Sequence, residues 1–142
     1  MNIIVLGAGS FGTAIANEFS VKKSNNVVLF SRSQAKVDEI NKFHTNKSYF
    51  PNKHLTKFLS ATSNENEINN ADVIFIALPS SVIIETLSKL KSYFKKDALV
   101  VNLSKGLFAG GVTIVNEIKE SLNTEISILK FELKYSSTIL GL

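Results

Sequence analysis

Three glycines near the start of the chain have the spacing of a phosphate-binding turn. Gly7, Gly9 and Gly12 follow the apolar run "IIVL" and precede helix-forming residues. Between a strand and a helix, the first glycine of such a pattern allows a tight turn and the second lets a pyrophosphate approach the backbone. The third lets the helix pack closely on the strand, and the N–H groups that begin the helix then face the phosphates. The pattern predicts a dinucleotide-binding loop, and a glycine-rich turn without a ligand is the alternative.

The end of the second expected strand bears on the choice between NAD and NADP. An acidic residue there, about 20 residues beyond the glycines, would bind the ribose hydroxyls of NAD. This sequence has Ser31-Arg32-Ser33 at that place. No carboxylate would repel a 2′-phosphate, and Arg32 can pair with one. We therefore expect NADP or NAD as the cofactor, with NADP favoured; a solvated loop arginine is the alternative.

Two further segments should reach the same edge of a sheet. Pro79-Ser80-Ser81 closes the fourth expected strand, and "NLSKG" at 102–106 closes the fifth. Ligands of open α/β sheets bind outside the carboxyl ends of the strands. Lys105 is therefore well placed to meet an anionic substrate or a cofactor phosphate, although a lysine in a loop is more commonly only solvated.

The elements that would position these residues alternate along the chain. Apolar runs predict strands at 3–6, 27–30, 58–61, 73–78, 98–103 and 126–129. Helical spacing predicts helices at about 10–20, with Phe11, Ile15 and Phe19 on its apolar stripe, around 37–43, across Ile83, Leu87, Leu90 and Phe94, and around 115–122. Ser80 or Ser81 is expected to cap the third helix, and 44–57 should be irregular. This order predicts an α/β fold in one domain, a Rossmann-type doubly wound parallel sheet with the first strand beside the fourth.

Composition excludes several classes of function. The 142 residues include no cysteine, which excludes disulfides, thiolate catalysis and Cys-built zinc sites. His44 and His54 show no metal-ligand spacing, so we expect no metal site. The 16 basic and 12 acidic residues give a net charge of +4 but form no basic stripe, so we expect no nucleic-acid partner. With neither a secretory leader nor a bilayer-spanning run, we expect a cytoplasmic protein without a membrane partner.

Four segments carry a resemblance to a known family. In order and spacing, "GAGSFGTAIA", "VVLFSR", "ADVIFIALPS" and "VNLSKGL" resemble the N-terminal domain of NAD(P)-dependent glycerol-3-phosphate dehydrogenase. The stretch "NKSYFPNKHLTKFLSAT" resembles that family's loop between the second helix and the third strand. The resemblance covers about residues 1–129. It implies hydride transfer between NAD(P)H and dihydroxyacetone phosphate, or the reverse from sn-glycerol 3-phosphate, in the supply of phospholipid precursors.

The same resemblance implies roles for particular residues. Ser10 and Phe11 would touch the cofactor from the glycine loop, and Arg32 would contact its adenosine end. Tyr49 would reach it from the neighbouring loop, and Lys105 would touch both the cofactor and the small phosphate substrate. Core packing is the alternative for Phe11, and packing within its loop is the alternative for Tyr49.

The end of the sequence departs from the family. The family continues with a Ser-Gly-Pro motif and a helical domain that supplies the proton-accepting lysine, whereas "KFELKYSSTILGL" follows Leu129 here. The resemblance therefore implies a truncated domain, 1–129, with an unmatched tail, 130–142, no catalytic residue and little or no activity alone. The alternative is a stand-alone NADP-binding module without turnover, which could form a homodimer through exposed surface or the alternating tail. A lesser alternative is an enzyme of another family acting on a small hydroxy or keto acid.

Overall fold

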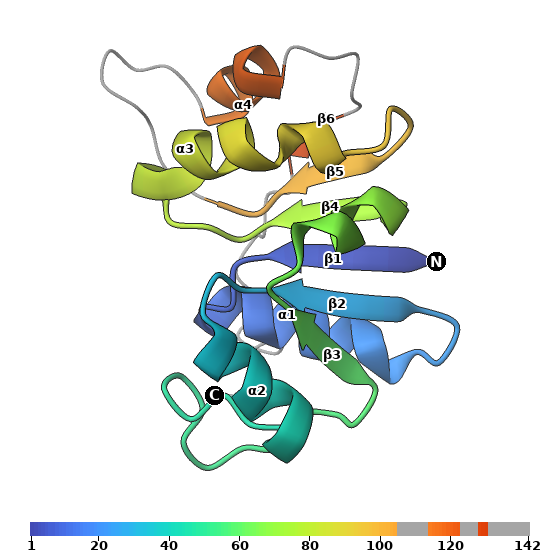
Figure 1. Ribbon diagram of the computed structural model, residues 1–142, viewed down its shortest axis with the longest axis vertical. Helices are drawn as coiled ribbons and strands as arrows, with labels where there is room; N and C mark the ends of the chain where they lie inside the picture. Colours follow the sequence, from blue (N-terminus) through green and yellow to red (C-terminus); the bar gives the residue numbers. More distant parts are fainter. Residues whose placement is uncertain (105–113, 123–127, 131–142) are drawn as a thin grey trace.

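The fold is a parallel β-sheet covered by helices on both faces, as Figure 1 shows. The computed structural model describes residues 1–104, 114–122 and 128–130. These residues form a six-stranded sheet with the strand order β3-β2-β1-β4-β5-β6, and each neighbouring pair is parallel. The first strand lies beside the fourth, so the predicted Rossmann-type doubly wound α/β fold is confirmed. The domain boundary at 129 stays a prediction, and residues 131–142 of the tail lie outside the described residues.

The elements agree with the sequence-based expectations to within a few residues. The strands are β1 (Asn2–Leu6), β2 (Asn26–Phe30), β3 (Leu59–Thr62), β4 (Val73–Ile76), β5 (Leu99–Asn102) and β6 (Ile128–Lys130). The helices are α1 (Ser10–Val21), α2 (Gln34–Phe43), α3 (Ser80–Leu90) and α4 (Ile114–Leu122), with 3₁₀ turns η1 (Glu65–Asn70) and η2 (Lys91–Tyr93). The turn η1 was not expected, because its sequence "ENEINN" offers a single apolar residue and no periodicity.

The hydrophobic core lies in two layers, one on each face of the sheet. On one face, α1 and α2 cover side chains that include Ile3, Val5, Val27 and Leu29. On the other face, α3, α4 and η1 cover side chains that include Ile4, Leu6, Ile74 and Ile76. Successive residues of β1 thus enter opposite layers, as expected for a strand buried on both faces.

Helix α1 packs on the sheet through small side chains, which corrects the apolar stripe expected for it. Its buried residues are Gly12, Thr13, Ala16 and Ser20. Phe11, Ile15 and Phe19 are only partly buried, and the Phe19 ring stacks on Phe75 with its centroid 5.0 Å away. Small side chains let the helix approach the strands closely, which the turn that precedes it requires.

Helix α3 begins and ends differently from the expectation. Its N-cap residue is Pro79, and no side chain caps the helix, so the predicted cap by Ser80 or Ser81 is wrong. Proline fits this position because its fixed φ suits the entry to a helix. The helix ends at Leu90 and continues as η2, so Phe94 lies beyond it. Phe94 nevertheless packs against the same core layer.

Within residues 1–104, 114–122 and 128–130, no helix combines the length and the apolar character needed to cross a bilayer. The same segments hold no group of three or more potential ligands that could bind a metal ion.

Candidate nucleotide-binding site

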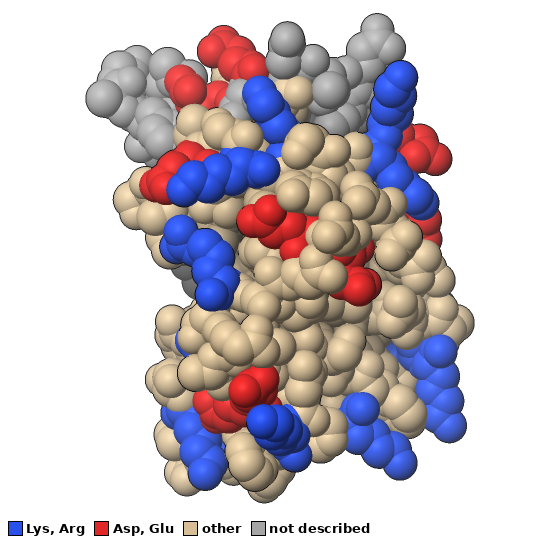
Figure 2. Space-filling view, viewed as in Figure 1, with Lys and Arg blue, Asp and Glu red and all other residues tan. Residues whose placement is uncertain are grey.

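A cavity of about 630 Å³ opens at the carboxyl ends of the central strands. It lies where the chain leaves β1 for one face of the sheet and leaves β4 for the other, the place where open α/β sheets bind ligands. The strands end on the left of Figure 1, and Figure 2 shows the surface indented on that side, with basic side chains beside it. The lining residues are Gly7, Ala8, Gly9, Ser10, Phe11, Phe30, Ser31, Arg32, Ser33, Lys36, Tyr49, Ala77, Leu78, Pro79, Val82, Thr86, Leu103 and Ser104.

Gly7 and Gly12 form the floor of the site by packing backbone against backbone. Gly7 has a φ of +112°, and a Cβ on it would lie 2.5 Å from the carbonyl oxygen of Ala77. A Cβ on Gly12 would overlap the carbonyl oxygen of Gly7. The N–H of Gly7 donates to the carbonyl oxygen of Phe30 at 3.1 Å. The tight turn and the close packing expected of these two glycines are therefore present.

Gly9 differs from the other two glycines because the protein itself leaves space around it. A Cβ on Gly9 would meet no atom within 4 Å. Gly9 is the N-cap of α1, and this helix has neither a side-chain cap nor an acidic residue in its first turn. The N–H groups of that turn have no partner within the helix and carry its positive dipole end. The arrangement suits an anion close to the backbone at Gly9.

Ser10 and Phe11 lie in the first turn of α1 and line the cavity, as the resemblance implies. Ser10 is exposed, and Phe11 is half-buried. The alternative of core packing does not account for Phe11 fully, since its side chain is absent from the buried core layers. Contact of either residue with a cofactor stays a prediction.

The turn after β2 brings an unpaired arginine to the cavity. Arg32 is exposed and forms no ion pair with any residue of the described segments. The pKa of Glu85 on α3 is lowered mainly by the hydrogen bond from Lys89, and the charge of Arg32 adds a smaller effect in the same direction. The described lining includes Arg32 and Lys36 but no carboxylate. This wall is therefore positively charged, which favours a phosphate over bare ribose hydroxyls.

The loop at 44–57, which contains neither helix nor strand, is fastened to the glycine loop by a buried asparagine. Asn46 is fully buried, and its Nδ2 donates to the carbonyl oxygen of Ala8 at 3.2 Å and to Oγ1 of Thr13 at 2.9 Å. Sequence reasoning missed Asn46, although the resemblance included its segment. The signal available was the segment "NKSYF", in which only Tyr49 was singled out.

Tyr49 lines the cavity and also packs within its surroundings. Its side chain is 46% exposed, and the Nζ atom of Lys36 lies 4.6 Å from the centroid of its ring. The same Nζ donates to the carbonyl oxygen of Ala8 at 3.4 Å. The observed position of the Tyr49 side chain thus allows both packing within the loop region and contact with a ligand in the cavity.

Ser104 fixes the chain at the far end of the cavity, one residue before Lys105. Its Oγ donates to the carbonyl oxygen of Leu78 at 2.6 Å, and Asn102 exchanges two hydrogen bonds with its backbone. Thr86 on α3 also lines the cavity; it is 6% exposed, and its Oγ1 has no partner among the described residues. Sequence reasoning missed both residues. Lys105, predicted to bind cofactor and substrate, lies outside the described residues.

Comparison with sequence families and curated proteins gives a consistent result. Residues 2–130 match the family described as the N-terminus of NAD-dependent glycerol-3-phosphate dehydrogenase. The chain is 36% identical over 118 residues to glycerol-3-phosphate dehydrogenase [NAD(P)+] of Neorickettsia sennetsu, a match that covers 83% of this chain and 35% of the relative. It is 37% identical over 113 residues to the protein of the same name from Carboxydothermus hydrogenoformans, covering 79% and 33%. The chain thus spans about a third of the length of these relatives.

Solved structures show the same likeness in three dimensions. A crystal structure of glycerol-3-phosphate dehydrogenase from Coxiella burnetii superposes with a TM-score of 0.83 at 23% identity, over 99% of this chain and 43% of that one. The enzyme from Plasmodium falciparum gives a TM-score of 0.78 at 26% identity, over 90% and 40%. Arogenate dehydrogenase from Synechocystis, at 0.64 and 19% identity over 85% and 37%, shares the fold alone.

Proposed function

We propose a function from the premise that this chain belongs to the NAD-dependent glycerol-3-phosphate dehydrogenase family, whose N-terminal domain it matches. The chain binds NADP(H), and NAD(H) less tightly, in the cavity at the carboxyl edge. The reaction that this cofactor site serves is hydride transfer between the nicotinamide and dihydroxyacetone phosphate or sn-glycerol 3-phosphate, in phospholipid precursor synthesis. This chain contributes the cofactor site.

One observation carries the proposal: an uncapped helix N-terminus and a basic wall line the same cavity. The first turn of α1 offers backbone N–H groups beside the open space at Gly9, which fits a pyrophosphate. Arg32 lines the same cavity without an ion-pair partner among the described residues. A volume of about 630 Å³ lies in the range typical of sites for small organic ligands.

Each part of the cavity has a distinct task in this proposal. The glycine loop binds the pyrophosphate, and Arg32 binds the adenosine end, where its guanidinium can pair with a 2′-phosphate. Asn46 holds the neighbouring loop against the glycine loop, and Tyr49 contacts the cofactor from that loop. When bound, the nicotinamide cofactor supplies or accepts the hydride.

The substrate proposed is a small phosphate ester that binds beside the nicotinamide. Lys105 is the residue proposed to contact it, next to Ser104, whose backbone and hydroxyl are fixed to the ends of β4 and β5. No residue of the described lining is proposed to take or give the alcohol proton. This chain therefore contributes cofactor binding and no proposed catalytic residue.

The test is a titration of the purified chain with NADPH and, in parallel, NADH, followed by nicotinamide fluorescence. We expect saturable binding of both, with the lower Kd for NADPH. Absence of binding for both would contradict the proposal, and tighter binding of NADH would contradict the NADP preference. Addition of dihydroxyacetone phosphate to the NADPH complex then measures turnover, and consumption of NADPH would assign hydride transfer to this chain as well.

A further inference from the structure

We propose that Lys36 is a second cation that selects the cofactor, acting with Arg32 to bind a phosphate on the adenosine ribose. The inference rests on the proposed function and deepens it. Lys36 occupies the first turn of α2, four residues after Arg32, and both line the cavity. Two cations only four residues apart can approach a single phosphate group from different sides.

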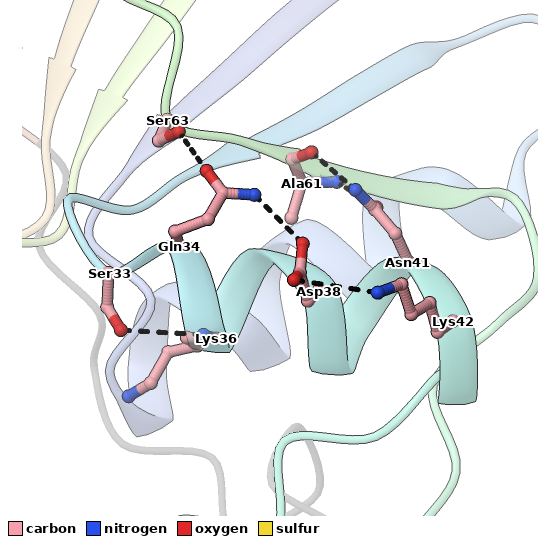
Figure 3. A network of polar contacts seen from close by, with 8 residues as sticks. All are labelled: Ser33, Gln34, Lys36, Asp38, Asn41, Lys42, Ala61 and Ser63. Carbon is pink, nitrogen blue, oxygen red and sulfur yellow. Dashed lines mark hydrogen bonds and ion pairs between the residues drawn. The ribbon is translucent and has the colours of Figure 1, made fainter.

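The direction of the Lys36 side chain distinguishes it from the other polar side chains of α2. Figure 3 shows Gln34, Asp38 and Asn41 on the side of the helix that faces β3, where Asn41 Nδ2 donates to the carbonyl oxygen of Ala61 at 2.9 Å. Lys42 pairs with Asp38 at 3.6 Å. The Lys36 side chain extends away from this network, toward the glycine loop, where its Nζ lies 3.4 Å from the carbonyl oxygen of Ala8.

The present contacts of the Lys36 ammonium are weak and can be exchanged for an anion. Its acceptor on Ala8 is a neutral oxygen at the long limit of a hydrogen bond, and the Tyr49 ring lies 4.6 Å from its Nζ. No carboxylate of the described residues forms an ion pair with it. A charge-assisted hydrogen bond to phosphate would be considerably stronger than the bond to a peptide oxygen.

Glu39, an acidic neighbour on α2, is already engaged elsewhere. Its Oε1 accepts from the N–H of Lys47 at 2.7 Å and from Oγ1 of Thr45 at 2.9 Å. The hydrogen bond from Lys47 is the main cause that lowers the pKa of Glu39, and the charge of Lys36 is the smallest. The positive charge of Lys36 therefore remains largely uncompensated on the cavity side.

The position of Lys36 favours the ribose phosphate over the pyrophosphate as its ligand. In doubly wound sheets the pyrophosphate sits at the N-terminus of the first helix, and the adenosine ribose lies at the end of the second strand. Lys36 lies in the first turn of α2, just beyond the turn that follows β2 and carries Arg32. Its flexible four-carbon side chain can turn from Ala8 of the glycine loop toward the ribose. A phosphate monoester carries about −1.5 to −2 charges at pH 7, so a second cation beside Arg32 would strengthen its binding.

The experiment compares Lys36→Gln with Lys42→Gln, a matched loss of one positive charge on the same helix but outside the cavity. Each variant and the parent chain are titrated with NADPH and NADH, and with adenosine 2′,5′-bisphosphate and AMP as probes without nicotinamide. We expect Lys36→Gln to raise the Kd of NADPH and of the bisphosphate about tenfold, equivalent to about 1.4 kcal/mol. The Kd of NADH and AMP should change less than twofold, and Lys42→Gln should change none. Lys36→Arg should keep most of the preference.

Three results would overturn the inference. Equal weakening of NADPH and NADH by Lys36→Gln would place the ammonium at the pyrophosphate, and unchanged affinities would remove it from the site. A preference for NADPH that does not weaken when the pH falls from 7 to 5 would also contradict it, because the phosphate takes up a proton near pH 6 and keeps only about one negative charge. Failure of the parent chain to bind any nucleotide would instead overturn the proposed function itself, so the two failures are distinguishable.

Discussion

The polar groups at the amino and carboxyl ends of the strands differ in whether they have hydrogen-bond or ion-pair partners. At the amino edge, the Asp72 carboxylate accepts from the N–H of Asn2 at 2.8 Å and pairs with Lys95 at 3.1 Å. The backbone of Asp72 is bonded as well, since its N–H donates to Asn2 and its carbonyl oxygen accepts from Leu99. The cavity beside this edge holds only about 50 Å³.

At the carboxyl edge, several polar groups of the described residues have no partner. Arg32 has no ion pair there, Thr86 Oγ1 has no hydrogen bond, and neither has Oδ1 of the buried Asn46. Buried polar groups in folded proteins are usually satisfied. Thr86 and Arg32 both line the cavity, which suits a ligand at this edge. Asn46 Oδ1 and a third buried atom without a partner, His44 Nδ1, belong to residues outside that lining. The amino edge is built to hold the strands together.

The largest expected effect is a loss of stability from substitution of the packed glycines of the glycine loop, Gly7 and Gly12. Gly12→Ala should lower the free energy of unfolding by about 3 kcal/mol, because its Cβ overlaps the backbone of Gly7. Gly7→Ala should do the same, because its φ of +112° and the carbonyl oxygen of Ala77 exclude a side chain. Urea denaturation measures both changes.

Gly9→Ala is the matched control for this prediction. Its Cβ meets no protein atom within 4 Å, so the free energy of unfolding should change by less than about 1 kcal/mol. The affinity for NADPH should nevertheless fall, since the methyl group would occupy space expected for the pyrophosphate. Equal destabilisation by all three substitutions would contradict the division into a packed floor and an open ligand surface.

A second prediction concerns the buried link between the two loops. Asn46→Ala should lower the free energy of unfolding by about 2 kcal/mol, because Thr13 and Ala8 lose a hydrogen-bond donor inside the protein. It should also weaken NADPH binding, since the glycine loop loses its tie to the Tyr49 loop. Asn41→Ala removes two hydrogen bonds to the backbone of Ala61, outside the cavity. That control should lose stability without a change in affinity, and a loss of affinity in both variants would contradict the prediction.

The sequence predicts the central part of the fold well because its signals are local. Apolar runs locate β1 and β4, and the spacing from Gly7 to Gly12 locates the turn between β1 and α1. The carboxyl edge follows from topology alone, since parallel strands end together. For that reason the cavity and most of its predicted residues lie where the sequence places them.

The parts that the sequence did not predict depend on contacts between distant residues. Asn46 reaches Ala8 across 38 positions, and Lys36 reaches it across 28. No local pattern distinguishes a buried loop asparagine or a cavity-facing lysine from solvated ones. The small buried face of α1 also escaped prediction, because periodicity of large apolar residues pointed to Phe11, Ile15 and Phe19.

A third prediction tests the unpaired charge at the carboxyl edge. Arg32→Ala should raise the Kd of NADPH about tenfold, equivalent to about 1.4 kcal/mol, and leave that of NADH within twofold. Its effect on unfolding should be negligible, because Arg32 forms no ion pair with the described residues and is exposed. A variant that binds NADPH and NADH as the parent does would remove the basis for the NADP preference.

The smallest effect is expected at the amino edge, where the charge is already paired. The N–H of Asn2, followed by Lys95, holds the pKa of Asp72 below its ordinary value of 3.8. Because the folded state favours the charged carboxylate, this stabilisation is present above about pH 4 and is lost as the pH falls through the lowered pKa. Asp72→Asn should therefore lower the urea midpoint slightly at pH 7, with the difference from the parent shrinking at pH 3, and leave the Kd of NADPH unchanged. A difference that grows as the pH falls would contradict this assignment, and a changed Kd would contradict the separation of the two edges.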